Sequence, residues 1–196
     1  MPTRHLDLGC GPTPRNPYGC DEAHAVDLAP SPGVDPRFFR AANLSLQPIP
    51  HPDSSFDSVS AYDFLEHVPR VLPVRDGAGT RFPFVELMSE IHRVLKPGGR
   101  LYAVTPAFPH AEAFVDPTHV NVITSRTHTY FIDTTPNARM YGFRGSFRVL
   151  RAHWMRKRLS QAYEPASPGL VHRARIALDV LKRRRTHMLW ELEALK

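Results

Sequence analysis

A short apolar run near the start of the chain leads directly into a turn with two glycines. Residues 5–8 have the character of a strand, Gly9-Cys10-Gly11 follow at once, and prolines come next at positions 12, 14 and 17. Glycine lets a backbone turn tightly and approach a ligand closely, so this arrangement is typical of an α/β sheet that binds a nucleotide. The prolines exclude the long helix that usually starts here, and with it the helix N-terminus that binds phosphate. We therefore expect a nucleoside ligand without phosphate groups.

An acid at the end of the second expected strand supports this interpretation. Asp27 follows Gly11 by 16 residues. A carboxylate at that place can accept hydrogen bonds from both hydroxyls of a ribose. The glycine turn alone is a weak signal, and its pairing with Asp27 is more specific.

Apolar periodicity predicts the remaining elements. The expected strands are His5–Leu8, Ala25–Leu28, Phe38–Ala42, Phe56–Ala61, Arg100–Thr105, Phe147–Trp154 and His187–Leu195. One helix is expected over Phe84–Lys96, ended by Pro97-Gly98-Gly99, and another over Leu170–Lys182. The strand–helix–strand spacing predicts a mostly parallel α/β sheet, with a C-terminal antiparallel pair like a hairpin and few helices on the N-terminal side.

Length and composition indicate one domain, residues 1–196, in the cytoplasm. No apolar run approaches the ~18–20 residues of a membrane span, and residues 1–4 lack the apolar stretch of a signal peptide. The two cysteines, Cys10 and Cys20, do not indicate a disulfide framework.

The net charge of +6 is concentrated in one segment. Residues 148–185 carry 11 Lys/Arg against two Asp/Glu, whereas residues 1–147 carry 13 against 15. Such a segment can face phosphates or an anionic membrane surface, or it can be a solvated helix face. A peripheral membrane contact stays open. Nucleic acid is not expected, because the basic residues are not interleaved with aromatic residues in a recognised module.

The motifs resemble those of class I S-adenosylmethionine-dependent methyltransferases over residues 5–131. The resemblance is carried by Asp7-x-Gly9-x-Gly11, Asp27, "NLSLQPIPHPDSSFDSVSAYDFLEHVPR" and "ELMSEIHRVLKPGGRLYAVTPAF". Four stretches, "RNPYGCDEAHAVDL", "AYDFLEHVPRVL", "TRFPFVELM" and "FVDPTHVN", are also similar to small methyltransferases of bacterial cell-surface polysaccharide gene clusters. The resemblance implies a Rossmann-like sheet, S-adenosylmethionine as cofactor, a cofactor-binding core at 1–131, and a C-terminal part at 132–196.

The resemblance also implies the residues that bind the cofactor. Gly9, Cys10 and Gly11 would pass under its methionine part, Asp27 would hold the ribose, and Leu28 would pack on adenine. Asn43 and Leu44 stand near the end of the third strand, where many members place an acid against the adenine amine. Ala61 and Tyr62 would border the sulfonium. The full set is Asp7, Gly9, Cys10, Gly11, Asp27, Leu28, Asn43, Leu44, Ala61 and Tyr62.

Two clusters of acids and histidines follow the fourth and fifth strands. In the second, Asp116 and His119 are close enough to share a site, with His119 as a general base that the carboxylate orients. The alternative is that Asp116 caps a turn and His119 binds backbone. In the first, Glu66 and His67 are further catalytic candidates, although a short helix with His67 packed near the cofactor explains them as well. No metal site is assigned, and the alternative ligand set for a divalent ion is Asp116, His119 and Glu66.

The expected activity is O-methylation of a sugar or glycan intermediate. A small-molecule methyltransferase of specialised metabolism is an alternative. Two further alternatives are a nucleic-acid-modifying or nucleic-acid-binding protein that uses the basic segment, and a cofactor-binding pseudoenzyme or assembly partner. Four aromatic residues are expected either in the core or in a wall of the acceptor site: Tyr130, Phe131, Tyr141 and Phe143. The sequence does not predict the oligomeric state.

Overall fold

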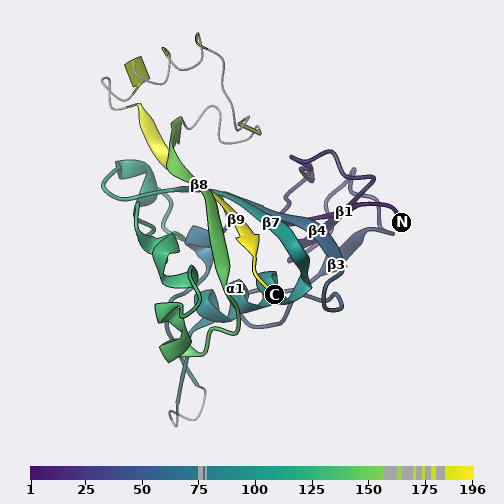
Figure 1. Cartoon of the computed structure of the whole chain (residues 1–196), viewed down its shortest axis with the longest axis horizontal. Helices are drawn as coiled ribbons and strands as arrows, with labels where there is room; N and C mark the ends of the chain where they lie inside the picture. The colour runs from purple at the N-terminus through teal and green to yellow at the C-terminus, as the bar shows by residue number, and fades with distance from the viewer. Residues whose placement is uncertain are drawn as a thin grey trace.

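Seven strands form one sheet in the order β3-β2-β1-β4-β7-β9-β8 (Figure 1). The structure, a computed structural model, describes all residues except 75, 76, 78, 157–162, 165–169, 171–173, 175–177 and 180–183. The strands are β1 (Arg4–Leu8), β2 (Glu22–Asp27), β3 (Phe39–Ala41), β4 (Phe56–Tyr62), β7 (Leu95–Pro106), β8 (Phe147–Arg156) and β9 (Arg185–Ala194). β1 to β4 and β7 pair in parallel, whereas β9 runs antiparallel to β7 and β8. The predicted fold class is confirmed.

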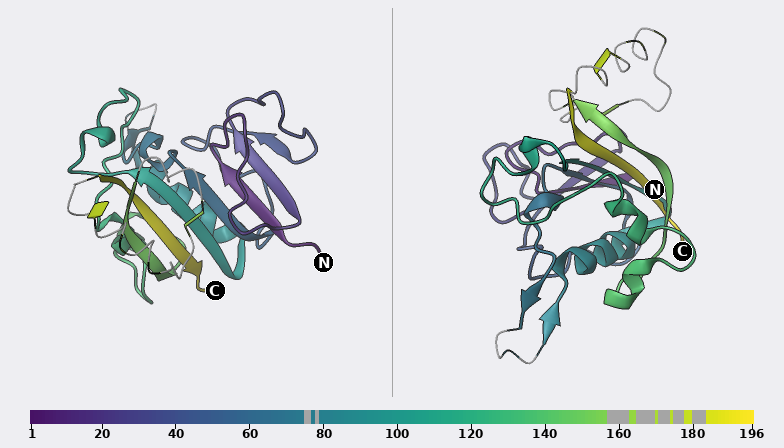
Figure 2. Two further views of the ribbon diagram at one scale, coloured as in Figure 1. Left: turned by 90° about the horizontal axis from the view of Figure 1, so that it is seen from above. Right: turned by 90° about the vertical axis from the view of Figure 1, so that its left-hand side faces the viewer.

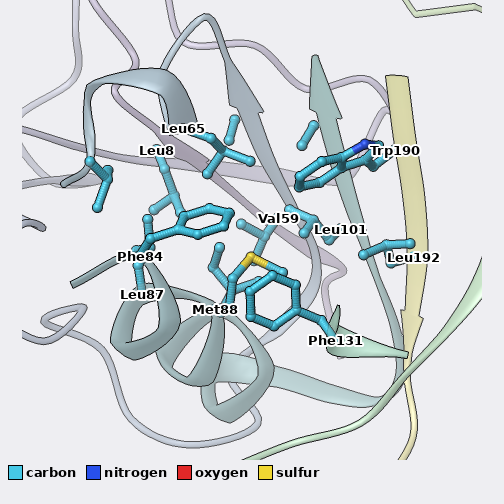
Figure 3. Close-up of a cluster of buried hydrophobic side chains, with 14 of the residues drawn as sticks. Leu8, Val59, Leu65, Phe84, Leu87, Met88, Leu101, Phe131, Trp190 and Leu192 are labelled. Carbon is cyan, nitrogen blue, oxygen red and sulfur yellow. The ribbon is translucent and has the colours of Figure 1, made fainter. Parts of the chain in front are cut away.

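The helix α1 (Pro83–Val94) packs against one face of this sheet. Pro83 lies in its first turn, where a missing N–H leaves no hydrogen bond unmade. Phe84 and Met88 join Val59 and Trp190 of the sheet in the main apolar core (Figure 3). Burial of this apolar face, more than helix propensity, holds α1 in place. The turns η3 (Thr127–Phe131) and η4 (Asn137–Tyr141) lie on the same side of the sheet as α1 (Figure 2).

The boundary between α1 and β7 lies earlier than predicted. The helix ends at Val94 rather than Lys96, and β7 begins at Leu95 rather than Arg100. The reason is pairing with β4: Leu95 pairs with Phe56, the register then shifts, and Arg100 pairs with Ser58. Residues 96–99 lie between these two pairs, and Gly98 has a φ of +74° that favours glycine.

The N-terminal connections are short of helices, as predicted. Residues 9–21 and 28–38, all described, contain none. Tyr18 directly follows the Pro-rich segment 12–17. Its ring packs against Tyr102 of β7, with ring centroids 6.2 Å apart. Its hydroxyl donates to Glu191 Oε1 of β9 at 2.7 Å. Tyr18 therefore covers part of the second face of the sheet, where a helix usually packs.

Two described arginines of the C-terminal basic segment, Arg148 and Arg156, are paired within the fold. Arg148 and Glu193 form an ion pair of 2.7 Å between β8 and β9. Arg156 and Asp179 form another, of 2.6 Å. These two arginines support the interpretation of a structural rather than a ligand-binding role. Most of the helix expected over 170–182, and Arg183, lie outside the described residues. No helix among the described residues has the length and apolar character needed to span a membrane.

Candidate active site

A cavity of about 850 Å³ opens at the carboxyl ends of β1, β2 and β4. Its volume lies within the ~300–1,000 Å³ typical of small-ligand sites. Five of the predicted cofactor residues line it: Gly9, Asp27, Leu28, Asn43 and Leu44. The other lining residues are Val26, Ala42, Ser45, Leu46, Phe64, His67, Val68, Pro69, Leu72, Pro117, Thr118 and Val120.

Gly9 shapes the floor of this cavity. Its φ is +63°, in the left-handed region, and an added Cβ would lie 2.4 Å from Cδ2 of Phe64. The backbone of the turn therefore runs directly against the Phe64 ring, which only glycine permits. Sequence reasoning identified Gly9 but missed Phe64, because nothing local distinguishes that ring from a core phenylalanine.

Two backbone N–H groups orient the Asp27 carboxylate. Its Oδ2 accepts from the Gly11 N–H at 2.9 Å, and its Oδ1 accepts from the Leu28 N–H at 2.7 Å. Each carboxylate oxygen keeps a further lone pair. The side chain thus has a fixed orientation and free accepting capacity, which fits the ribose of S-adenosylmethionine.

Leu28, Asn43 and Leu44 form the expected adenine end. Leu28 is 69% exposed and Leu44 is buried, and both line the cavity. Asn43 Oδ1 accepts from the Ser45 N–H at 3.1 Å, so the amide also shapes the turn after β3.

The other five predicted cofactor residues, Asp7, Cys10, Gly11, Ala61 and Tyr62, are absent from the cavity wall. The Arg15 N–H donates to Asp7 Oδ2 at 2.8 Å, and the Arg15 guanidinium lies 4.8 Å from the centre of the Tyr62 ring. The Pro-rich segment therefore covers the edge of β1 and β4 where the resemblance places the methionine part of the cofactor. Cys10 is a buried free thiol, and Cys20 is also free.

A buried hydrogen-bonded chain lies beneath the glycine turn, and sequence reasoning missed it. The Ser60 hydroxyl donates to Asp7 Oδ1 at 2.6 Å, so His5 Nε2 donates to the Ser60 oxygen at 2.7 Å. His5 Nδ1 then accepts from the Ser58 hydroxyl at 2.7 Å. Burial raises the pKa of Asp7 to about 6 and lowers the pKa of His5 to about 3. The four residues alternate along β1 and β4, a pattern that a single strand does not reveal.

Glu66, His67 and His119 form a second cluster at the rim of the cavity. The atoms that they offer lie within 4.8 Å of one another. The two rings meet edge to face with centroids 4.8 Å apart, and Glu66 Oε1 lies 3.9 Å from His119 Nε2. Burial raises the pKa of Glu66 to about 8. Burial, and then the charge of His119, lower the pKa of His67.

The prediction that Asp116 orients His119 is wrong. Asp116 Oδ1 accepts from the backbone N–H and the hydroxyl of Thr118, at 2.8 and 2.7 Å, so Asp116 caps a turn. His119 Nδ1 donates to the Ala113 carbonyl at 3.3 Å. The carboxylate beside His119 is Glu66, and the imidazole that Asp116 supports, through Thr118, is His67.

Long-range hydrogen bonds join the residues after β4, which include Glu66 and His67, to the segment 116–121, which includes His119. The N–H groups of Val120 and Asn121 both donate to the Glu66 carbonyl, at 3.0 and 2.9 Å. Asn121 Nδ2 donates to the Leu65 carbonyl at 3.0 Å, and the Thr105 hydroxyl donates to Glu66 Oε2 at 2.8 Å. The turn η1 (Leu65–His67) and residues 116–121 are thereby fixed to each other and to the end of β7.

Residues 6–103, half of the chain, match the methyltransferase domain family. No curated protein matches the chain. Among solved structures, a SAM-dependent methyltransferase from Archaeoglobus fulgidus is 17% identical with a TM-score of 0.59, covering 97% of this chain and 86% of that one.

Two other solved structures share the fold. An S-adenosylmethionine-dependent methyltransferase from Mesorhizobium loti is 17% identical with a TM-score of 0.53, covering 97% of this chain and 90% of that one. A Haloferax volcanii complex of the Trm112 activator with a methyltransferase is 15% identical with a TM-score of 0.56, covering 99% and 83%. With the sheet order and the Asp27 cavity, the match over half of the chain shows that it belongs to the methyltransferase domain family, with S-adenosylmethionine as methyl donor.

Proposed function

We propose that the protein methylates a hydroxyl group of a sugar or glycan intermediate. The observation that carries this proposal is the cluster of Glu66, His67 and His119 beside the cofactor cavity. A hydroxyl is a weak nucleophile until its proton is removed, whereas a neutral amine attacks with its own lone pair. A group of carboxylate and imidazole lone pairs is therefore what a hydroxyl acceptor requires.

When bound, S-adenosylmethionine supplies a methyl group that is already activated by its sulfonium. The acceptor oxygen would take this methyl group, and the electron pair of the carbon–sulfur bond would stay on sulfur. A lone pair of the Glu66–His67–His119 cluster takes up the hydroxyl proton. Asp27, Gly9 and Phe64 hold the cofactor in place, and alignment of this kind contributes ~7–11 kcal/mol to lowering a barrier.

A second cavity supports a sugar as the acceptor class. It has a volume of about 710 Å³ and is lined by Arg70 and Val71, whose neighbours Pro69 and Leu72 line the cofactor cavity. Aromatic and hydroxyl side chains line it, including Phe82, Tyr130, Tyr141, Thr127 and Thr129. Aromatic faces with nearby polar groups suit sugar rings. The sequence resemblance to methyltransferases of polysaccharide gene clusters also favours such acceptors.

The acceptor class is tested by transfer of tritiated methyl groups to a panel of nucleotide sugars, oligosaccharides, amines and thiols. We expect label in alkali-stable ethers of the sugar compounds. Label in amines or thiols alone would overturn the proposal.

The Asp27→Ala variant is expected to bind S-adenosylmethionine at least about tenfold more weakly, because two charge-assisted hydrogen bonds to the ribose are lost. Isothermal titration calorimetry measures the affinity, and Asp35→Ala, a partly exposed acid outside the cavity, is the control. Equal affinities of the wild type and Asp27→Ala would remove Asp27 from the cofactor site.

The His119→Ala variant is expected to lower kcat by about 100-fold while the cofactor affinity stays near normal, the usual cost of losing an acid–base group. His110→Ala, in the same loop, is the matched control. Wild-type turnover in His119→Ala would remove His119 from the reaction.

A further inference from the structure

Glu66 has an oxygen that the fold leaves without a hydrogen bond. The side chain is 1% exposed. Its Oε2 accepts from Thr105, whereas its Oε1 has no hydrogen-bond partner among the described residues and lies 3.9 Å from His119 Nε2. A buried oxygen without a partner is costly, so it indicates a missing proton donor or cation at this point.

In both histidines the Nδ1 atom makes the hydrogen bond, which leaves Nε2 of each ring available. His119 Nδ1 faces a carbonyl, which can only accept, so Nδ1 carries the proton and Nε2 has a lone pair. The Thr118 hydroxyl gives its own proton to Asp116, so its oxygen accepts from His67 Nδ1 at 2.9 Å. His67 Nε2 therefore also has a lone pair. His119 Nε2 and Glu66 Oε1 thus face each other 3.9 Å apart with no hydrogen bond between them.

This arrangement is the one that metal-binding histidines adopt. Such histidines donate the second ring N–H to a carbonyl or a carboxylate-linked group, which fixes the tautomer and the orientation of the ring. Here Ala113 supplies the carbonyl for His119, and Asp116, through Thr118, supports His67. Two imidazole nitrogens and one carboxylate oxygen favour a transition metal over Mg²⁺ or Ca²⁺, which prefer oxygen ligands.

We propose that Glu66, His67 and His119 form a binding site for one divalent first-row transition-metal ion, of the Zn²⁺ or Co²⁺ type. Three protein ligands leave coordination positions open for an oxygen of the acceptor. The offered atoms, now within 4.8 Å of one another, must move closer by about an ångström to reach the ligand–ligand spacing of a site with ~2.0–2.2 Å bonds. Glu66 and His67 lie on η1, and His119 lies on the segment 116–121 that is hydrogen-bonded to η1, so small side-chain rotations can supply this movement.

The ion explains how the cluster activates a hydroxyl, and in this respect the inference rests on the proposed function. His67 and Thr118 line the cofactor cavity, so the site borders the space where methyl transfer takes place. A bound divalent ion lowers the pKa of an oxygen that it holds. Glu66, His67 and His119 would then hold the ion, which would stabilise the alkoxide while the hydroxyl proton leaves to water. With metal bound, the cluster would act through the ion rather than as the base itself.

The test is metal binding by the full chain, without a polyhistidine tag and stripped with a chelator. Titration with Co²⁺ should give one visible-absorbing ion per chain, displaced by one equivalent of Zn²⁺. Glu66→Gln and His119→Ala should each weaken Zn²⁺ binding about 100-fold or more, and Thr118→Val, which frees His67 Nδ1, by about 10–100-fold. His110→Ala should bind as the wild type does, and near-ultraviolet circular dichroism checks that each variant is folded.

Absence of stoichiometric Co²⁺ and Zn²⁺ binding in the wild type would overturn the proposal, as would unchanged affinity in both Glu66→Gln and His119→Ala. The proposed function fails separately. If a variant unable to bind metal still methylates sugar hydroxyls, the ion has no role in the reaction and the proposed activity stands. Specific Zn²⁺ binding without any hydroxyl methylation would establish the site and reject the acceptor class.

Discussion

The Gly9→Ala variant is expected to lose about 2–5 kcal/mol of stability and to bind S-adenosylmethionine at least about tenfold more weakly. Two effects add. A left-handed φ of +63° costs ~1–2 kcal/mol for a residue with a Cβ. The Cβ would also lie 2.4 Å from Cδ2 and 3.1 Å from Cβ of Phe64, so ring rotation alone does not relieve the contact, and such overpacking costs ~1–3 kcal/mol. Phe64 lines the cofactor cavity, so its displacement changes the binding surface.

Gly19→Ala is the matched control for this experiment. Gly19 has nearly the same φ, +62°, but a Cβ there meets nothing within 4 Å. We expect it to lose only the ~1–2 kcal/mol of backbone strain and to bind the cofactor normally. Urea denaturation and calorimetry measure the two quantities. Equal losses in the two variants would show that the Gly9–Phe64 contact has no energetic role.

The Asp7→Asn variant is expected to become much more sensitive to acid than the wild type. Between pH 7 and pH 4.5, unfolded His5 gains a proton near its usual pKa of 6.5, while folded His5, with a pKa of about 3, does not. This difference lowers stability as the pH falls. In the wild type, Asp7 has a pKa of about 6 in the folded state and its usual value of 3.8 in the unfolded state, so the folded state gains this proton first as the pH falls. This difference raises the free energy of unfolding over the same pH range. The two contributions largely cancel.

Asparagine does not titrate, so Asp7→Asn removes the Asp7 contribution and leaves the opposite His5 contribution in place. With ~1.4 kcal/mol per pKa unit, Asp7→Asn should lose about 2 kcal/mol more stability than the wild type between pH 7 and pH 4.5. The amide can still take the Arg15 N–H on its oxygen and donate to Ser60, so the variant is expected to fold. Urea denaturation at the two pH values measures the difference. Adding His5→Gln should abolish it, and an identical pH dependence of Asp7→Asn and the wild type would contradict the opposed pKa values.

The sheet was predictable from the sequence because its signals are local. Apolar runs, the glycine turn after β1 and Asp27 after β2 each lie within a few residues of the position that they specify. The start of β7 was not predictable from α1, since pairing of Leu95 with Phe56 decides it.

The candidate active site shows the same division. The side chains were identified as acids and histidines after β4 and β7, but their pairing was not. Asn121 and the Leu65 carbonyl are 56 residues apart, and their hydrogen bond places His119 beside Glu66 rather than Asp116. Contacts of this length depend on the whole fold, which a local motif does not report.

The place of β9 in the sheet has a consequence for synthesis of the protein. β9 lies between β7 and β8, although it leaves the ribosome after both. Until it emerges, β8 has no neighbouring strand and β7 has an open edge, the situation in which nascent chains aggregate. Tyr18 also lacks its partner Glu191 until then. Loading with S-adenosylmethionine should therefore follow release of β9, and a nascent chain stalled before residue 185 should bind chaperones instead of cofactor.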